Sequence, residues 1–223
     1  GETPVAEALT PQDIPVTMEQ YAFVYRWSDR AEDVHEDDVP MAIKKIAGQR
    51  AGLLLEMIKW GKAKSGTNVY YGGGVASRSL VNSLVSATLI ANVVRGLEAN
   101  MAELLTESLK ASPGYETRAI DSCYVGFTHP NMRYDLETTA GFIKAKDYPG
   151  GSADMIDPDE IGSLGKVRFI QSPHFTPYLT AGTTAAANTR LTNNLPNAGG
   201  AGNCDVYPIV IMGEEALCSV AFR

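Results

Sequence analysis

The stretch that decides the fold runs from Asp37 to Lys64 and reads DDVPMAIKKIAGQRAGLLLEMIKWGKAK. Apolar residues recur along it three and four positions apart, which is the spacing of a buried stripe on an α-helix. The stripe consists of Val39, Ile43, Ile46, Ala47, Leu54, Met57 and Ile58. We therefore predict one long helix over residues 38–64, with Lys44, Lys45, Gln49, Glu56 and Lys59 largely on its other side.

Both ends of this helix carry the appropriate signals. Asp37 or Asp38 can cap the start, Pro40 suits a first turn, and Gly66 follows as a stop. Acidic residues precede the helix and lysines occupy its last turns, which opposes the helix dipole at both ends. At 1.5 Å per residue the helix would be roughly 40 Å long, so we expect other elements to pack along it.

Composition excludes several classes of function. The formal net charge of −7 does not suit a nucleic-acid groove, which needs a basic patch to neutralise phosphates. No apolar run approaches the ~18 residues that span a bilayer. Cys123, Cys204 and Cys218 lack metal-ligand spacing, and we interpret them as small apolar fillers in a reducing compartment. Because the chain begins at Gly1 without a methionine, we expect it to be a trimmed or processed piece.

The remaining elements mix strands and helices without a βαβ rhythm, which predicts an α+β protein. Aromatic residues alternate through residues 18–29 and predict a strand there. Further strands are expected at 69–71, 122–130, 166–173, 205–213 and 216–222. Helices are expected at 79–109, with a break near Asn100, and at 131–142, closed by Gly141. Loops are expected at 1–17, 111–119, 147–163 and 179–203.

The glycine clusters do not indicate a specific binding site. Residues 61–67, GKAKSGT, resemble a phosphate-binding loop only superficially, because no lysine follows Gly66 and no strand leads into the segment. A plain helix stop is the favoured interpretation. Gly72, Gly73 and Gly74 permit a tight turn.

The three histidines are candidate functional groups. His35 lies in a carboxylate cluster with Asp33, Glu36, Asp37 and Asp38, which suits either a hard cation or, as we favour, a helix start. His129, at a strand end before Pro130, is either a general base or, as we favour, a structural residue at a corner. His174 lies in a turn that looks exposed.

The carboxylates and aromatic residues also have plain interpretations. Asp157, Asp159 and Glu160 suit a solvated turn, and Asp135 and Glu137 a short surface helix. The aromatic residues at 21–27 lack the interleaved basic residues of a base-stacking platform, so they predict packing on a sheet face. We therefore expect no catalytic, cofactor-binding or metal-binding residues, and we favour a structural or binding role.

Five motifs in order resemble the major capsid proteins of tailed bacteriophages, in the N-four-like capsid family with a Hong Kong 97-type fold. They are His129-Pro130, Asp135-Leu136, Glu160-Ile161-Gly162, Val167-Arg168-Phe169 and Asp205-Val206-Tyr207-Pro208. The N-terminal half is also similar: an extended-loop end, a strand leading to the long helix, and the connection SGTNVYYGGGVASR at 65–78. The 179–203 loop departs from the family pattern as an insertion, and the family's N-terminal arm would precede Gly1.

The resemblance implies a domain plan and a function. Residues 1–17 would be the remnant of the extended loop or arm, and residues 18–66 with 205–223 a peripheral domain built on the 38–64 spine helix. Residues 67–204 would form an axial domain carrying the polar loop. The protein would assemble through pentamers and hexamers into an icosahedral head, without catalysis.

The resemblance also implies partners and location. The subunits would contact copies of themselves, together with scaffolding, portal and decoration proteins. The head would enclose double-stranded DNA without sequence-specific binding and without a membrane, as a virion capsid made in the host cytoplasm. Two alternatives stay open: an encapsulin-like cellular shell protein, and a hydrolase that uses His129.

Overall fold

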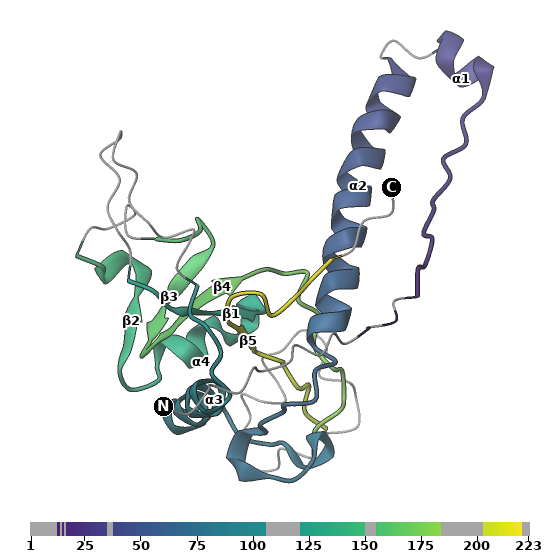
Figure 1. Cartoon of the computed structure of the whole chain (residues 1–223). Coiled ribbons are helices and arrows are strands. Elements are labelled where there is room, and N and C mark those ends of the chain that lie inside the picture. The colour runs from purple at the N-terminus through teal and green to yellow at the C-terminus, as the bar shows by residue number, and fades with distance from the viewer. Residues whose placement is uncertain are drawn as a thin grey trace, which may run out of the picture. The chain divides into compact units, whose positions relative to one another are not determined.

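The computed structural model describes residues 13, 15, 17–34, 38–105, 121–149, 155–183 and 203–219 (Figure 1). Two units divide the chain, residues 1–51 and 52–223, and the division falls within the longest helix. The class is α+β, as predicted, because one mixed sheet is combined with helices that do not alternate regularly with its strands. The α-helices are α1 (Asp29–Val34), α2 (Val39–Ala63), α3 (Ala87–Ala99) and α4 (Arg133–Glu137). Short 3-10 helices are η1 (Gly72–Gly74), η2 (Arg78–Leu80), η4 (Pro130–Met132) and η5 (Ala145–Asp147). The strands are β1 (Tyr124–Thr128), β2 (Phe142–Lys144), β3 (Glu160–Leu164), β4 (Val167–Gln171) and β5 (Val210–Met212).

Helix α2 confirms the predicted long helix to within one residue at each end. Asp38 caps it, because its carboxylate oxygen Oδ1 accepts a hydrogen bond from the backbone N–H of Met41 at 3.0 Å. The helix ends at Ala63, before the predicted stop at Gly66. Two residues of the predicted apolar stripe, Ile46 and Met57, are exposed, and the other five are only half-buried. The prediction that this stripe is buried is therefore wrong, and the buried residue of α2 is Trp60.

The C-terminal half of α2 is attached to unit 2 through Trp60, which the predicted stripe did not include. Its indole ring stacks on Phe175 with the ring centroids 4.5 Å apart, and its Nε1–H donates to the carbonyl of Thr176 at 3.3 Å. Glu56 accepts a hydrogen bond from the hydroxyl of Ser172 at 3.3 Å, one turn earlier on the helix. The helix is therefore held by the segment that follows β4.

The five strands form one sheet in the order β2-β3-β4-β1-β5. β1 and β4 run parallel in register, with Tyr124 opposite Val167 and Thr128 opposite Gln171. The other neighbouring strands are antiparallel, so β2 and β5 form the edges. Figure 1 shows α3 and α4 beside this sheet.

Alternate residues of the two central strands build the core. Tyr124, Val167 and Phe169 are completely or almost completely buried, and Leu136 of α4 and Ile90 of α3 join them in one apolar cluster. Such alternation is expected because successive side chains of a strand point to opposite faces. Gly126 of β1 leaves the room that the Phe169 ring occupies, since a Cβ at this position would lie 2.9 Å from that ring.

The predicted strand at 18–29 is wrong. Residues 17–28 pair with no strand in the part of the chain that the structure describes, and the predicted stretch ends at Asp29, where α1 begins. A strand needs a neighbouring ladder as well as an alternating pattern, and within the described chain this segment has none. The predicted loop at 1–17 lies almost entirely outside the described residues.

The glycine-rich connection and the second helix also differ from prediction. Residues 69–71 form no strand, and a turn of 3-10 helix follows at Gly72–Gly74. The helix predicted at 79–109 begins only at Ala87, because Ser86 caps it by accepting the N–H of Leu89 at 3.3 Å. The predicted break near Asn100 is confirmed, since α3 ends at Ala99.

In the second half of the chain, β1 and β4 confirm the predictions. The helix predicted at 131–142 is limited to α4, which ends at Glu137, so its predicted end at Gly141 is wrong. The loop predicted at 147–163 is wrong at its end. Glu160–Leu164 is the buried strand β3, and β2 was not predicted at all. The strand expected at 205–213 is limited to β5, and the described residues 216–219 form no strand. Most of the predicted 179–203 loop, residues 184–202, lies outside the described residues.

β5 bears on the predicted division into domains. The sequence grouped residues 205–223 with the long helix, but β5 pairs with β1, and the N–H of Glu214 donates to the carbonyl of Glu103 at 3.0 Å. Both partners belong to the part predicted as the axial domain. This pairing connects β5 and Glu214 to residues of that part, while the domain division itself stays a prediction.

Candidate functional site

His129 lies at the end of β1 and caps the 3-10 helix that follows. Its Nδ1 accepts the backbone N–H of Asn131 at 3.1 Å, and the side-chain amide of Asn131 donates to the hydroxyl of Tyr207 at 2.9 Å. The His129 and Tyr207 rings lie 5.3 Å apart between centroids. Burial lowers the pKa of His129, so the imidazole is neutral over a wider pH range. These contacts make His129 a corner residue, as we favoured.

Of the other two histidines, the structure describes only His174. His174 is exposed, in the turn after β4, and its backbone N–H donates to the Ser172 hydroxyl at 3.3 Å. His35, Glu36 and Asp37 lie outside the described residues. Of the predicted cluster, Asp33 belongs to α1 and Asp38 caps α2. Among the described residues, no group of three histidine, cysteine or carboxylate side chains could hold a metal ion.

The predicted solvated turn at 157–160 divides into two environments. Asp157 and Asp159 form it as predicted, with the N–H of Asp159 donating to the Asp157 carboxylate at 2.8 Å. Glu160 is buried, which contradicts the prediction. It accepts the hydroxyl of Tyr148 at 2.6 Å and the N–H of Ile156 at 2.7 Å, and an Arg168 guanidinium nitrogen lies 3.5 Å away.

This network explains why Glu160 can be buried as the first residue of β3. A buried carboxylate is tolerated where donors and a cation surround it, and Glu160 has both. Burial, and next the bond to Glu160, raise the pKa of Tyr148, which keeps the phenol protonated as a donor. The group fastens Tyr148 and Ile156 to the first residue of β3, which is a structural role.

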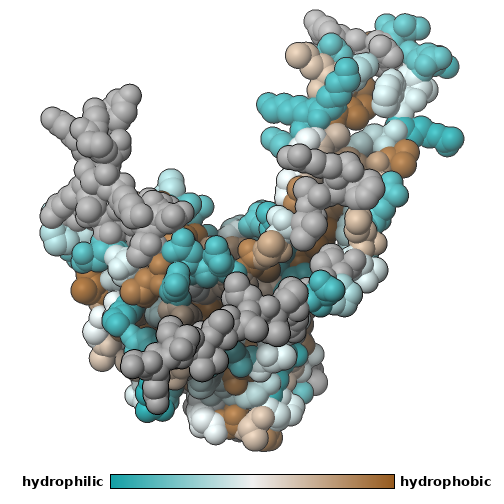
Figure 2. Space-filling view, viewed as in Figure 1, coloured by the Kyte–Doolittle hydropathy of each residue, from teal (hydrophilic) through white to brown (hydrophobic). Residues whose placement is uncertain are grey.

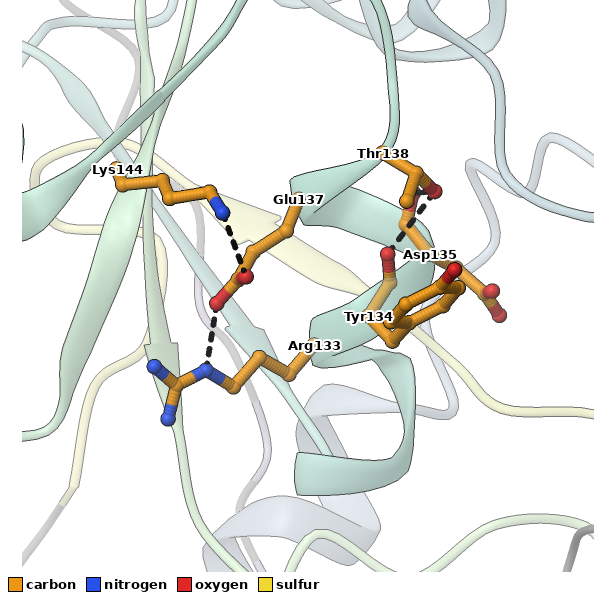
Figure 3. Close-up of polar contacts among 6 residues, drawn as sticks. All are labelled: Arg133, Tyr134, Asp135, Glu137, Thr138 and Lys144. Atoms are coloured by element: carbon orange, nitrogen blue, oxygen red, sulfur yellow. Dashed lines mark hydrogen bonds and ion pairs between the residues drawn. The ribbon is translucent and has the colours of Figure 1, made fainter.

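Glu137 of α4 forms an ion-pair group with Arg133 and Lys144 (Figure 3). Glu137 accepts the Arg133 guanidinium at 2.7 Å and lies 3.2 Å from the Lys144 ammonium on β2. The Arg133 hydrogen bond, followed by that of Lys144, lowers the pKa of Glu137. The carbonyl of Asp135 accepts the hydroxyl of Thr138 at 3.2 Å, so this residue helps to close the helix. The predicted surface helix is confirmed.

The cysteines differ from one another. Cys123 and Cys204 are buried, as expected for small fillers, and burial raises the pKa of Cys123 to about 11. Cys218 is exposed, so the filler interpretation is wrong there. All three are free thiols.

The segment 61–67 does not form a phosphate cradle. Its first three residues are the last turn of α2. The ammonium of Lys64 donates to the Thr176 hydroxyl at 3.3 Å and lies 4.9 Å from the centroid of the Tyr178 ring. The favoured interpretation as a helix stop therefore stands.

Exposed apolar surface, rather than a catalytic cluster, is the main unexplained feature of the chain. Residues 17–28, which we call the aromatic arm, expose large apolar side chains on both sides of an unpaired backbone. Tyr21, Phe23 and Trp27 occupy odd positions, while Met18 and Val24 occupy even ones, and Val24 is 90% exposed. An exposed apolar segment of this size is typical of an interaction surface.

A shallow apolar groove beside β5 is a second surface, which the sequence analysis did not predict. Its volume is about 220 Å³. Leu105, Val125, Phe127, Met212 and Leu217 contribute apolar side chains, and Glu214 and Glu215 are acidic members of its lining. Because it is assembled from three separate parts of the chain, no local pattern could have predicted it.

Comparison with known proteins adds no assignment to these surfaces. No protein-family model matches the chain, and no curated protein matches it. Among the described residues, no helix is both long enough and apolar enough to cross a membrane.

Proposed function

We propose that this protein is a structural shell subunit, the major capsid protein of a tailed bacteriophage with a Hong Kong 97-type fold. The five ordered motifs support the family, and the aromatic arm is the observation that carries the function. Its side chains are exposed within the described residues, and a neighbouring molecule would bury them. A shell supplies such a molecule around every subunit.

The extended backbone of the arm favours a second copy of the chain as this molecule. An extended segment gains little by folding on itself, because a lone strand leaves its N–H and C=O groups unpaired. Lying on a neighbour, it buries alternate side chains and can pair its backbone. The contact is heterologous, since an arm of one subunit meets a different surface on the next, and repetition of such a contact closes into rings. Pentamers and hexamers are rings of this kind.

The charge of the chain agrees with a container for DNA. With a net charge of −7, the subunit would repel phosphates at long range, so DNA would be held by enclosure and not by binding to the wall. Scaffolding, portal and decoration proteins would be further partners. The virion would be the final location and the host cytoplasm the place of assembly.

The hydrolase alternative gains nothing from the geometry, since Nδ1 of His129 already accepts a backbone N–H. The encapsulin-like alternative shares the fold and the arm argument, and a cargo-loading motif encoded beside the gene would favour it. Phage shell protein is the function we propose.

Electron microscopy of the full-length protein, expressed with its neighbouring genes, tests this function. Uniform shells are expected, and a monomer under all conditions would refute the proposal. The double variant Phe23→Ser/Trp27→Ser should lower the yield of shells, because it removes two large side chains from one side of the arm. Met18→Ser/Val24→Ser is the matched control from the other side of the arm. Unchanged assembly in both variants would show that the arm does not contribute to shell formation.

A further inference from the structure

The exposed side of α2 combines lysines with apolar residues and glycines. Met41, Lys45, Gly48, Gly52, Leu55 and Lys59 are three or four positions apart, so they share one face of the helix. Together they are called the lysine face here, and Lys44 borders it. All are exposed, Met41 to 68% and Leu55 to 59%. Figure 2 shows hydrophilic and apolar side chains interspersed along α2.

The lysine face is open in the single chain. Within the described residues, Lys44, Lys45 and Lys59 take part in no ion pair. A Cβ atom built on Gly48 or Gly52 would meet nothing within 4 Å. No neighbour in the described chain therefore requires glycine at these two positions, although glycine lowers helical propensity. Exposed glycines on a helix face let another backbone approach closely.

The same chain carries an acidic segment of opposite character. Residues 29–38 read DRAEDVHEDD, with six acidic residues and one arginine. Asp29 and Asp33 lie four positions apart on α1, which places them on one side of that helix, and both are exposed. Neither forms an ion pair within the described residues. The acidic side of α1 and the lysine face are thus complementary in charge, yet unpaired.

We propose that the lysine face binds the acidic side of α1 from a second copy of this chain. This inference rests on the proposed self-association and names one of its contacts. Each copy offers one acidic segment and one lysine face, so the contact is heterologous and can continue around a ring. Because opposed surface charges govern the rate and the salt dependence of association, the contact is sensitive to ionic strength.

Charge reversal and complementation test the contact. Sedimentation velocity over a range of concentrations measures self-association at about 50 mM salt, where the Debye length exceeds ~10 Å. The variants Lys44→Glu/Lys45→Glu and Asp29→Lys/Asp33→Lys should each self-associate roughly tenfold more weakly than the parent protein. An equimolar mixture of the two variants should regain association, because every contact between unlike copies is then attractive. Circular dichroism checks that each variant keeps its helix content.

The matched control is Arg50→Glu/Lys146→Glu. It reverses the same number of exposed positive charges, with Arg50 on the opposite side of α2 and Lys146 on η5. This control should associate like the parent protein. An equal loss in the control would show a net-charge effect and overturn the proposal.

The remaining outcomes also decide whether the proposed contact exists. If both reversed variants fail and their mixture does not recover, the lysine face meets α1 of its own chain or an acidic partner of another kind, and the proposal is wrong. It is equally wrong if the variants associate normally, while the proposed shell function then survives. A parent protein that stays monomeric at every salt concentration would remove both the shell function and this contact.

Discussion

Replacing Trp60 by alanine should remove the main attachment of the C-terminal half of α2 within unit 2. Trp60 is 5% exposed, stacks on Phe175 at 4.5 Å, and donates from Nε1 to the Thr176 carbonyl at 3.3 Å. Truncation of a buried aromatic side chain to alanine costs about 3–5 kcal/mol. Within that range, stacking accounts for about 0.5–1.5 kcal/mol and the hydrogen bond for about 1 kcal/mol. The free energy of unfolding should fall by about 3–5 kcal/mol.

A second substitution separates the hydrogen bond from the stacking. Trp60→Phe keeps a ring against Phe175 but loses the Nε1–H donor, so the expected loss is only about 1–2 kcal/mol. Phe175 also meets the edge of the Phe127 ring at 5.7 Å, which limits how far it can move to fill the space. The parent protein should therefore be the most stable, Trp60→Phe should come next, and Trp60→Ala should be the least stable.

The measurement is urea unfolding followed by far-UV circular dichroism, and the chain provides its own control. Trp27, the other tryptophan, is 46% exposed in the aromatic arm. Trp27→Phe should change the free energy of unfolding by less than about 0.5 kcal/mol, and it leaves Trp60 as the single fluorescent reporter of unit 2. If Trp60→Ala cost less than about 1 kcal/mol, or no more than Trp27→Phe, the attachment described above would be wrong.

Four further predictions each concern a single residue. Tyr148→Phe should lower the free energy of unfolding by about 1–3 kcal/mol in urea melts, because it removes a donor from buried Glu160. Thr128→Val should be neutral or stabilising in the same melts, since the buried Thr128 hydroxyl has no hydrogen-bond partner among the described residues; a clear loss would reveal one. The lowered pKa of Glu137 means that its ion pairs stabilise the fold above the ordinary pKa of 4.5 and lose that effect as pH falls through the folded-state value. Glu137→Gln should therefore cost about 0.5 kcal/mol at pH 7 and nothing at acidic pH, while an equal cost at both would point to packing. A thiol reagent at pH 8 should label Cys218 first in the native protein, as checked by peptide mass spectrometry.

The elements that the sequence predicted correctly are those whose pattern is local and complete. In α2 the three-and-four spacing, the Asp38 cap and the lysine-rich end all lie within one segment. β4 shows its buried face directly, because Val167 and Phe169 alternate with less buried neighbours. Such signals depend on a few adjacent residues and need no knowledge of the partner element.

The elements that were missed depend on residues far away in the chain. β3 begins at Glu160, a charged residue after a turn, and only the donors Tyr148 and Ile156 with the nearby Arg168 make its burial possible. The sequence alone gave those three residues no connection to one another. In the same way, Trp60 lay outside the apolar stripe because its partner, Phe175, lies 115 positions further along the chain. Tertiary contacts of this kind override local pattern.

The candidate surfaces also show what local sequence patterns can and cannot predict. The expectation that no catalytic group is present rests on the motifs of the sequence, and it remains a prediction. The groove beside β5 joins Leu105, Val125, Met212 and Leu217, which no spacing rule relates. By contrast, the alternation in the aromatic arm was visible in the sequence, but the described residues form no strand there.

That error is informative about the arm. Period-two alternation of aromatic residues is selected where one side of an extended segment packs against something. Residues 17–28 have this pattern and an unpaired backbone, but the described part of the chain supplies no ladder for them. A strand pattern that has no neighbouring strand among the described residues suits pairing with another chain, as the proposed shell function would require. The wrong strand prediction and the proposed shell function therefore rest on the same property of this segment.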